Sequence, residues 1–393
     1  MIELRGSTWD HTRGYAPMVA TSEAYAATHP DVHIHWERRT LSDFAEMSLP
    51  ELALRYDLIV LDHPWIGGCV AKGSLLPLDP YLDAAFLSDQ VQNGIGRSHA
   101  SYHFHGQQWA LAIDAAAQVS AYRPDLLAQL DVEVPQTWDE VITLGQRLKR
   151  QGRAHVTTPL LHIDCFPCFF TLCANAGEQA FTGEAVAVSR PVGRHVLGMM
   201  RTLMELGHQA AINWNPPKVL DEMSTGDEIV YCPLLFGYSN YARTGYRDHI
   251  IRFTNIPADP DDKPRGAILG GGGLAISSGC KNPEAAADYA AFVASSSIQS
   301  GMYFDSGGQP GYRGAWLSGH TNAVAGNFFG DTLATLDLAA MRPRYDGWIS
   351  VQDHACQILH QFLTENGNPD RTLDTLDEAY RQSLAVAHPR GQV

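Results

Sequence analysis

The residues best placed by type and spacing to do chemistry are the cysteines of Cys165-Phe-Pro-Cys168. They follow the apolar run Leu160-Leu-His-Ile and are predicted to open a helix, a pattern typical of a thioredoxin-like thiol-disulfide oxidoreductase. A helix N-terminus would lower the pKa of the first thiol and favour its thiolate. The alternative is structural: Pro167 occupies the first helical turn and the small thiols pack nearby. Because the motif lies deep in a long chain, we favour the structural interpretation.

Three other motifs are interpreted without catalysis. Asp305-Ser-Gly-Gly308 resembles a serine-protease nucleophile segment, but the usual sequence around a general-base histidine is missing. Gly270 to Gly273 lacks the Lys-Ser/Thr of a Walker loop and the spacing of a dinucleotide fingerprint, so we expect these glycines to permit a close backbone approach, to a ligand or at a hinge. The pairs His33/His35 and His103/His105 could each offer two imidazoles to zinc, yet no further ligand stands at a suitable spacing. We therefore expect no catalytic residue, no metal and no cofactor.

Aromatic residues beside polar ones in predicted loops favour binding of a small molecule. An aromatic face can pack on the C–H side of a sugar, carboxylates, amides and imidazoles can satisfy hydroxyls, and an arginine can clamp a carboxylate. The loop from Trp9 to Gly14 is unusually charged, which favours an anionic ligand over a sugar. The candidate ligand-binding residues are Trp9, Asp10, His11, Arg13, His63, Trp65, Asp114, Gln118, His162, Asp164, Tyr238, Gly271, Gly272, Arg313 and Trp348.

Composition excludes several classes of function. Hydrophobic residues make up 45% of the 393 residues and charged residues 18%, which is typical of globular domains. The net charge of −15, without a cationic stripe, argues against a nucleic-acid partner. Since no run of about 18 apolar residues occurs, we expect no insertion into a membrane.

The order of predicted elements indicates an α/β protein. Residues 2–7, 32–36 and 56–61 read as strands separated by a helix over about 17–28, which predicts a βαβ-type sheet. Thr137, with Glu140 three residues later, predicts a capping box that opens a helix to about Arg150. Strands follow at 229–235 and 268–277, and further helices at 192–206, 283–295, 353–364 and 373–385.

A series of short segments gives the most specific indication. They are Tyr56-Asp-Leu-Ile-Val-Leu-Asp62, Gly73-Ser-Leu-Leu-Pro-Leu-Asp79, Gly106 to Trp109 leading to Ala121-Tyr-Arg-Pro-Asp125, Pro135-Gln-Thr-Trp138-Asp-Glu140, Gly271-Gly-Gly-Leu-Ala-Ile276 and Asn282-Pro-Glu-Ala-Ala-Ala287. Together they resemble the extracellular solute-binding proteins of ABC importers, family 1, whose members mostly carry carbohydrates.

The resemblance implies a fold and a function. The fold is the two-lobed periplasmic-binding-protein-like type II α/β fold, with residues 1–112 and 265–320 in an N-terminal lobe, residues 113–264 and 321–393 in a C-terminal lobe, and a hinge between them. The function is capture of a small polar ligand, a sugar or a small organic anion, in a cleft between the lobes, without catalysis, as a monomer that serves an ABC permease. The alternatives are a cytoplasmic sensor or carrier on the same fold, or an oxidoreductase that uses Cys165 and Cys168.

The compartment is predicted from two features. Met1 runs into Ile2-Glu-Leu-Arg-Gly without the basic and apolar regions of a signal peptide, and seven cysteines are an odd number without a framework spacing. Both features favour the cytoplasm, with a periplasmic location as the alternative if a signal peptide has been trimmed.

Overall fold

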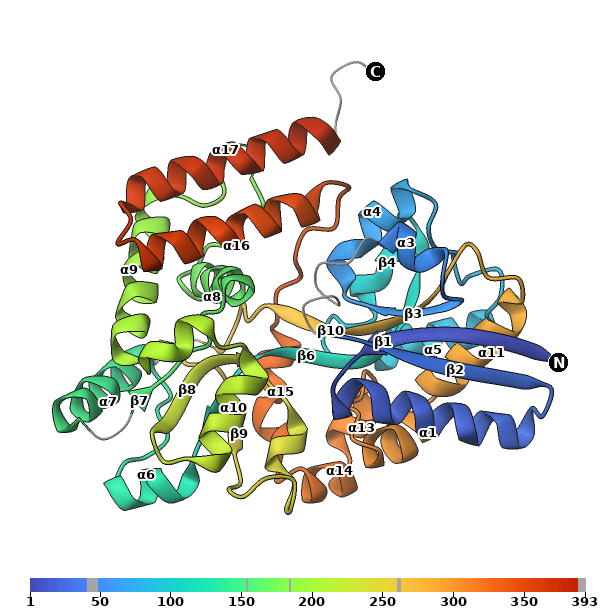
Figure 1. The fold of residues 1–393 in the computed structure, drawn as a ribbon, viewed down its shortest axis with the longest axis horizontal. Coiled ribbons are helices and arrows are strands. Elements are labelled where there is room, and N and C mark those ends of the chain that lie inside the picture. Colours follow the sequence, from blue (N-terminus) through green and yellow to red (C-terminus); the bar gives the residue numbers. More distant parts are fainter. Residues whose placement is uncertain (41–48, 153–154, 184, 260–262, 388–393) are drawn as a thin grey trace. The chain divides into compact units, whose positions relative to one another are not determined.

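The computed structural model describes residues 1–40, 49–152, 155–183, 185–259 and 263–387 (Figure 1). The chain divides into two compact units. Unit 1 comprises Met1–Ala116, Gly270–Ala323 and Arg344–Asp346, and unit 2 comprises Ala117–Leu269, Val324–Pro343 and Gly347–Val393. Across the described parts, no helix combines the length and the apolar character that a bilayer span requires.

Unit 1 is built on the sheet order β2-β1-β3-β10. Strands β1 (Ile2–Trp9), β2 (Val32–Arg39) and β3 (Leu58–Leu61) are parallel, as the βαβ pattern predicted, and β10 (Leu269–Ile276) runs antiparallel to β3. All four residues of β3 are buried, which explains its unbroken apolar sequence. The helices of this unit are α1 (Thr12–Thr28), α3 (Leu49–Ala53), α4 (Ile66–Ala71), α5 (Ala84–Asn93), α11 (Pro283–Ala294), α12 (Ser296–Ile298), α13 (Arg313–Leu317) and α14 (Gly319–Val324), and a short hairpin joins β4 (His103–Phe104) to β5 (Gln107–Gln108).

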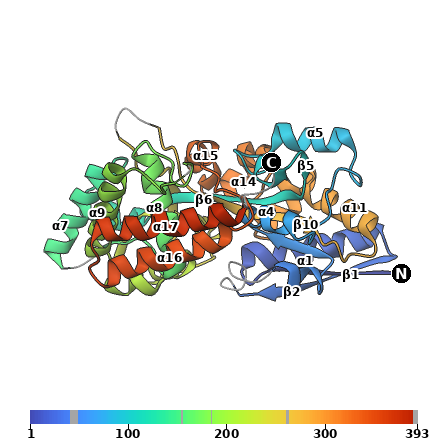
Figure 2. The same ribbon diagram turned by 90° about the horizontal axis from the view of Figure 1, so that it is seen from above.

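Unit 2 has a mostly antiparallel sheet. Strand β6 (Ala110–Tyr122) enters from unit 1 and pairs antiparallel with β8 (Ile229–Phe236) and β9 (Arg252–Thr254), while β7 (His155–Val156) pairs parallel with β8. Its helices are α6 (Pro124–Leu130), α7 (Trp138–Gln151), α8 (His162–Asn175), α9 (Arg190–Leu206), α10 (Pro216–Thr225), α15 (Phe328–Asp337), α16 (Trp348–Thr364) and α17 (Pro369–Ala387). Helices α16 and α17 lie side by side in both views (Figures 1 and 2).

The predicted capping box on α7 is confirmed. The Thr137 hydroxyl accepts a hydrogen bond from the backbone N–H of Glu140, and the Glu140 carboxylate accepts one from the backbone N–H of Thr137. The helix ends at Gly152, which adopts the left-handed conformation that favours glycine. A side-chain cap therefore sets the start of this helix, and the backbone conformation of a glycine sets its end.

One predicted element was wrong. The run Leu160-Leu-His-Ile, expected to form a strand before the cysteines, contains the start of α8 at His162, and Pro167 lies within that helix. A short apolar run is compatible with a buried strand or a buried helix. Here the apolar sequence continues beyond the length of a typical strand, which favours the helix.

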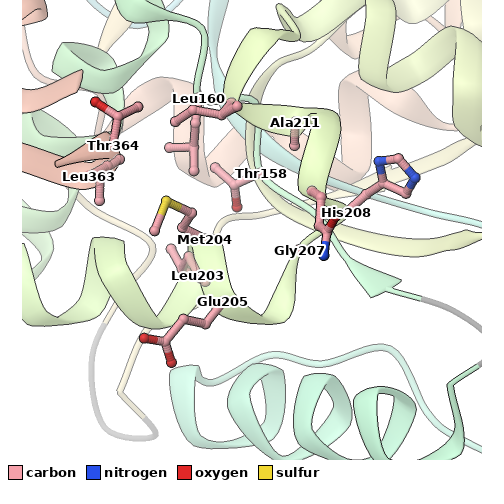
Figure 3. A pocket seen from close by; sticks show the side chains of 12 residues that line it. Thr158, Leu160, Leu203, Met204, Glu205, Gly207, His208, Ala211, Leu363 and Thr364 are labelled. Carbon is pink, nitrogen blue, oxygen red and sulfur yellow. The ribbon is translucent and has the colours of Figure 1, made fainter. Parts of the chain in front are cut away.

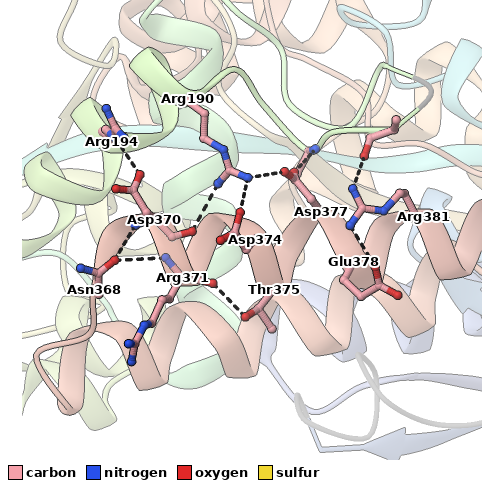
Figure 4. Close-up of polar contacts among 12 residues, drawn as sticks. Arg190, Arg194, Asn368, Asp370, Arg371, Asp374, Thr375, Asp377, Glu378 and Arg381 are labelled. Atoms are coloured by element: carbon pink, nitrogen blue, oxygen red, sulfur yellow. Dashed lines mark hydrogen bonds and ion pairs between the residues drawn. The ribbon is translucent and has the colours of Figure 1, made fainter.

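Helix α17 is joined to the start of α9 by a network of ion pairs (Figure 4). Arg190 donates to Asp374 at 2.5 Å and to Asp377 at 2.9 Å, and Arg194 donates to Asp370 at 2.7 Å. The two acceptors of Arg190 differ in exposure, because the side chain of Asp374 is 70% exposed and that of Asp377 is 4% exposed. Asp377 also accepts the backbone N–H of Ala187 at 2.7 Å.

This difference predicts unequal effects of two alanine substitutions. Asp377→Ala leaves a buried N–H and part of Arg190 without an acceptor, so it should lower the free energy of unfolding by about 2 kcal/mol. Asp374→Ala removes an exposed partner of the same arginine and should cost less than about 1 kcal/mol. Urea unfolding of both variants measures the costs, and equal costs would contradict this assignment.

Candidate functional site

A buried ion pair within unit 1 joins the start of α1 to strand β6. Arg13 is near the start of α1, directly after β1, and Asp114 is in the middle of β6. The Arg13 Nε donates to Asp114 Oδ2 at 2.8 Å, and a second guanidinium nitrogen donates to Oδ1, so the contact is bidentate. Burial raises the pKa of Asp114, and the Arg13 guanidinium opposes this shift. Two predicted site residues, 101 positions apart, thus neutralise each other.

The glycines of β10 allow this arrangement. A Cβ atom on Gly271 would lie 2.3 Å from the Asp114 carbonyl oxygen, and its φ of +119° is a backbone conformation that side chains rarely adopt. A Cβ on Gly272 would meet Val60, and the Trp9 ring lies beyond it. The predicted close backbone approach is therefore present. Within unit 1 it brings β10 against β6, so it is an approach between two strands and not to a ligand.

The remaining candidates of the first loop have separate roles. Trp9 is buried, and its ring covers Gly14 so closely that a Cβ there would lie 2.3 Å from it. His11 caps α1, because its Nδ1 accepts the backbone N–H of Arg13 at 3.0 Å. Asp10 is exposed and accepts from Arg38 at 3.2 Å. Of the predicted contacts in this loop, Asp10 is exposed and His11 is half-buried, so these two side chains can reach a solute.

The loop after β3 carries two further candidates of unit 1. His63 and Trp65 belong to the short 3-10 helix η1 (His63–Trp65), which Asp62 caps. His63 is buried, with its Nδ1 3.1 Å from the Asp62 carboxylate, whereas Trp65 is half-buried. Arg313 is half-buried at the first position of α13.

Gln118 belongs to a buried polar chain in unit 2. Its Oε1 accepts from the Thr171 hydroxyl at 2.6 Å, and that hydroxyl in turn accepts the backbone N–H of Ile268 at 3.0 Å. The side chain thus joins β6 to α8 and to the segment before β10. Because Oε1 accepts this buried hydrogen bond, Gln118 has a structural role.

The start of α8 places the other candidates of unit 2. His162 is half-buried at the first position of the helix, with its ring 6.5 Å from that of His360. Asp164 is 6% exposed, its Oδ2 has no hydrogen-bond partner among the described residues, and burial raises its pKa well above the ordinary value. Tyr238, after β8, is buried too.

Trp348 packs within unit 2. Its side chain is fully buried, and its ring meets those of Phe166 and Phe181 edge-on at 5.9 and 5.4 Å. The sequence signal that favoured a binding platform, an aromatic residue beside polar ones in a predicted loop, also fits the first residue of a helix that faces a core.

The structure does not support the oxidoreductase alternative. Cys165 and Cys168 lie past the first turn of α8, and both side chains are buried. Burial raises the pKa of Cys168 to about 12 and that of Cys165 well above its ordinary value, so the thiolate needed for disulfide exchange is disfavoured. The Cys165 thiol donates to the Leu160 carbonyl at 3.3 Å, as a packed structural thiol does.

The histidine pairs do not form a metal centre with other residues. His35 lies 3.0 Å from Glu3, and His103 is in β4. Within the described ranges, no three His, Cys, Asp or Glu side chains gather closely enough to hold a metal ion.

The Arg13–Asp114 pair predicts a large stability effect. Asp114→Ala leaves a buried guanidinium without its counter-charge and should lower the free energy of unfolding by about 3–5 kcal/mol. Glu37→Ala is the matched control, since Glu37 accepts from Arg5 on the neighbouring strand at 2.6 Å but is half exposed, and it should cost less than about 1 kcal/mol. Urea titration followed by tryptophan fluorescence measures both, and a small effect of Asp114→Ala would refute the structural role.

Asp164 predicts a pH dependence. Because burial raises its folded-state pKa, the folded chain keeps a proton that the unfolded chain loses above about pH 4. The stability that protonated Asp164 contributes at low pH is therefore lost as pH rises toward the raised pKa, by about 1.4 kcal/mol per pH unit. The free energy of unfolding of Asp164→Asn, measured with urea, should therefore increase relative to that of the unsubstituted chain as pH rises above about pH 4. A difference between the two free energies that stays constant with pH would contradict the raised pKa.

Comparisons with known proteins identify the family and the fold. The profile of the bacterial extracellular solute-binding protein family matches residues 8–300. The maltotriose-binding protein of Pyrococcus abyssi is 27% identical over 121 residues, which are 30% of this chain and only 25% of that relative's length. The structure of maltose-bound MalE3 of T. maritima superposes with a TM-score of 0.83 at 16% identity, covering 97% of this chain and 100% of that one. A Thermotoga lettingae solute-binding protein bound with α-D-tagatose has a TM-score of 0.81 at 14% identity, covering 98% and 100%. These likenesses confirm the predicted two-lobed α/β fold.

The predicted cytoplasmic location was wrong, because the matched family is extracellular. The cysteine count misled for a physical reason. All seven cysteines are free and buried, so neither oxidants nor partner thiols reach them, and an unpaired buried thiol says nothing about the compartment. The chain is thus a member of the bacterial extracellular solute-binding proteins.

Proposed function

We propose that the chain captures a carbohydrate or a polyol and delivers it, as a monomer, to an ABC permease. The observation that carries this proposal is the family match over residues 8–300. Support for the ligand class comes from structures of the same fold that contain bound maltose, α-D-tagatose or D-mannitol. All three are neutral molecules rich in hydroxyl groups.

The electrostatics of unit 1 favour a neutral solute over an anion. The expectation of an anionic ligand rested on the charged loop from Trp9 to Gly14, above all on Arg13. The Arg13 guanidinium is held by the Asp114 carboxylate through two donors, so both charges are already balanced. An incoming carboxylate would have to displace a buried, bidentate partner, which is unfavourable.

The proposed contacts are the fifteen residues selected from the sequence. Those with partly exposed side chains are the first to consider as direct contacts, namely Asp10, His11, Trp65, His162 and Arg313. Trp65 can pack on a sugar face, and the polar members can bond hydroxyls. The buried members, such as Asp114 and Gln118, hold the strands and loops that carry these contacts.

The proposed action is binding without chemical change. The chain passes between units at five places, after Ala116, Leu269, Ala323, Pro343 and Asp346. We propose that these connections act as a hinge, so that a solute bound by both units favours a closed form, to the extent that the solute binds that form more tightly. The solute leaves unaltered, and the permease recognises the closed form.

Calorimetric titration with maltose, maltotriose, tagatose, ribitol and mannitol tests the proposal. At least one of these should bind, and at 100 times its Kd it should add about 2.7 kcal/mol to the free energy of unfolding. Trp65→Ala should weaken that binding about tenfold or more, because a stacked ring contributes on the order of 1–3 kcal/mol.

Trp214→Ala is the matched control. Trp214 is also half-buried, but its ring stacks on His208 at 4.7 Å, so its loss should leave the affinity unchanged. Chromatography of the recovered solute checks that it is unaltered. Binding of none of these sugars and polyols, or tight binding of a carboxylate instead, would overturn the proposal.

A further inference from the structure

A pocket of about 410 Å³ lies wholly within unit 2, beside the C-terminal end of α9 (Figure 3). Its walls come from the segment after β7, the last turn of α9, the 3-10 helix η3 (Gln209–Asn213) and the end of α16. The wall side chains are mostly apolar: Leu160, Leu203, Met204, Ile212 and Leu363. Concave apolar pockets of this size bury small molecules well.

Thr158 adds a polar atom to this apolar lining. Its side chain is 1% exposed, and its hydroxyl has no hydrogen-bond partner among the described residues. Figure 3 shows the side chain among Leu160, Met204 and Gly207, at the inner wall of the pocket. The neighbouring Thr157, by contrast, accepts the backbone N–H of His208 at 3.2 Å. A buried hydroxyl that makes no hydrogen bond costs stability, so a molecule that offers it a partner is favoured.

The charged or titratable side chains of the lining, Glu205 and His208, lie at the rim of the pocket. Glu205 is exposed, and in Figure 3 its carboxylate points away from Thr158. His208 stacks on Trp214 and lies 3.4 Å from the Glu228 carboxylate. Among the residues that the structure describes, no arginine or lysine belongs to the lining, and the Lys149 ammonium donates to the Glu205 backbone carbonyl at 3.0 Å. An ionic ligand would therefore enter an apolar space without a counter-charge, which is unfavourable.

We propose that this pocket is a second binding site, for a small, neutral, mostly aliphatic molecule with one hydroxyl or carbonyl group. The aliphatic part packs on the leucine and methionine side chains, and the polar group pairs with the Thr158 hydroxyl once the Thr158 side chain has changed its χ1 rotamer to turn that buried hydroxyl toward the pocket. All lining residues belong to unit 2, so this proposal does not depend on the carbohydrate or polyol site proposed above.

The test uses cyclohexanol as the probe and cyclohexanecarboxylate as its charged counterpart. Met204 lies in the pocket wall, so its ¹³C-labelled methyl group reports binding by NMR, while Met18 and Met302 in unit 1 serve as internal references. Cyclohexanol should shift the Met204 signal saturably and leave both references unmoved. Cyclohexanecarboxylate should bind at least about tenfold more weakly, because its charge lacks a partner.

Three variants make the result specific. Thr158→Val keeps the shape but removes the hydroxyl, and it should weaken cyclohexanol binding about fivefold. Thr364→Trp places a ring from an exposed rim position over the opening and should abolish binding. Thr202→Val is the control. Thr202 is on α9, whose last turn lines the pocket, but its hydroxyl donates to the Gly198 carbonyl, so this variant should bind cyclohexanol as the unsubstituted chain does.

Several results would overturn the inference. They are a Met204 signal that does not respond to cyclohexanol, equal binding of the alcohol and the carboxylate, unchanged affinity in Thr158→Val, or a response that survives Thr364→Trp. Adding a sugar that binds the chain should leave the cyclohexanol affinity as it was, so the two proposals can fail separately.

Discussion

The bidentate contact between Arg13 and Asp114 is the interaction on which unit 1 depends most. It joins the start of α1 to the middle of β6, and both side chains are buried. A buried ion pair contributes little net stability, but either charge alone would be costly, so the two residues constrain each other. The same pairing balances the positive charge of Arg13, on which the expectation of an anionic ligand rested. The proposed preference for neutral solutes follows from this pairing.

Strand β6 shows how polar residues can occupy a strand that is buried on both faces. Twelve of its thirteen residues are buried, yet it contains Asp114, Gln118 and Ser120. Each has a partner within its own unit: Arg13 for Asp114, the Thr171 hydroxyl for Gln118 and the Pro233 carbonyl for Ser120. Since an unpartnered polar group in such a strand would be costly, the elements that pack against β6 must supply hydrogen-bond partners to these three side chains.

Local signals predicted much of the fold, and long-range contacts account for what they missed. The capping box at Thr137 and the continuous apolar run of β3 depend on neighbours in sequence, so both could be predicted. The burial of Trp348 depends on Phe166 and Phe181, which are 182 and 167 positions earlier, and Asp114 pairs with an arginine 101 positions earlier. No spacing rule indicates such pairs, so the residue types that suggested a binding site could not separate ligand contacts from framework residues.

The cysteines and Asp164 of α8 show why burial must be known before chemistry is assigned. From sequence, the Cys-x-Pro-Cys motif left a redox role open beside the favoured structural one, because a helix N-terminus stabilises a thiolate. In the structure the same groups lie in an apolar interior, where desolvation raises the pKa of the thiols and of the carboxyl alike. Neutral thiols are inert packing groups, whereas a neutral carboxyl is a hydrogen-bond donor as well as an acceptor. The same burial that disfavours redox chemistry at Cys165 and Cys168 makes Asp164 a framework group whose protonation couples the stability of the folded chain to pH.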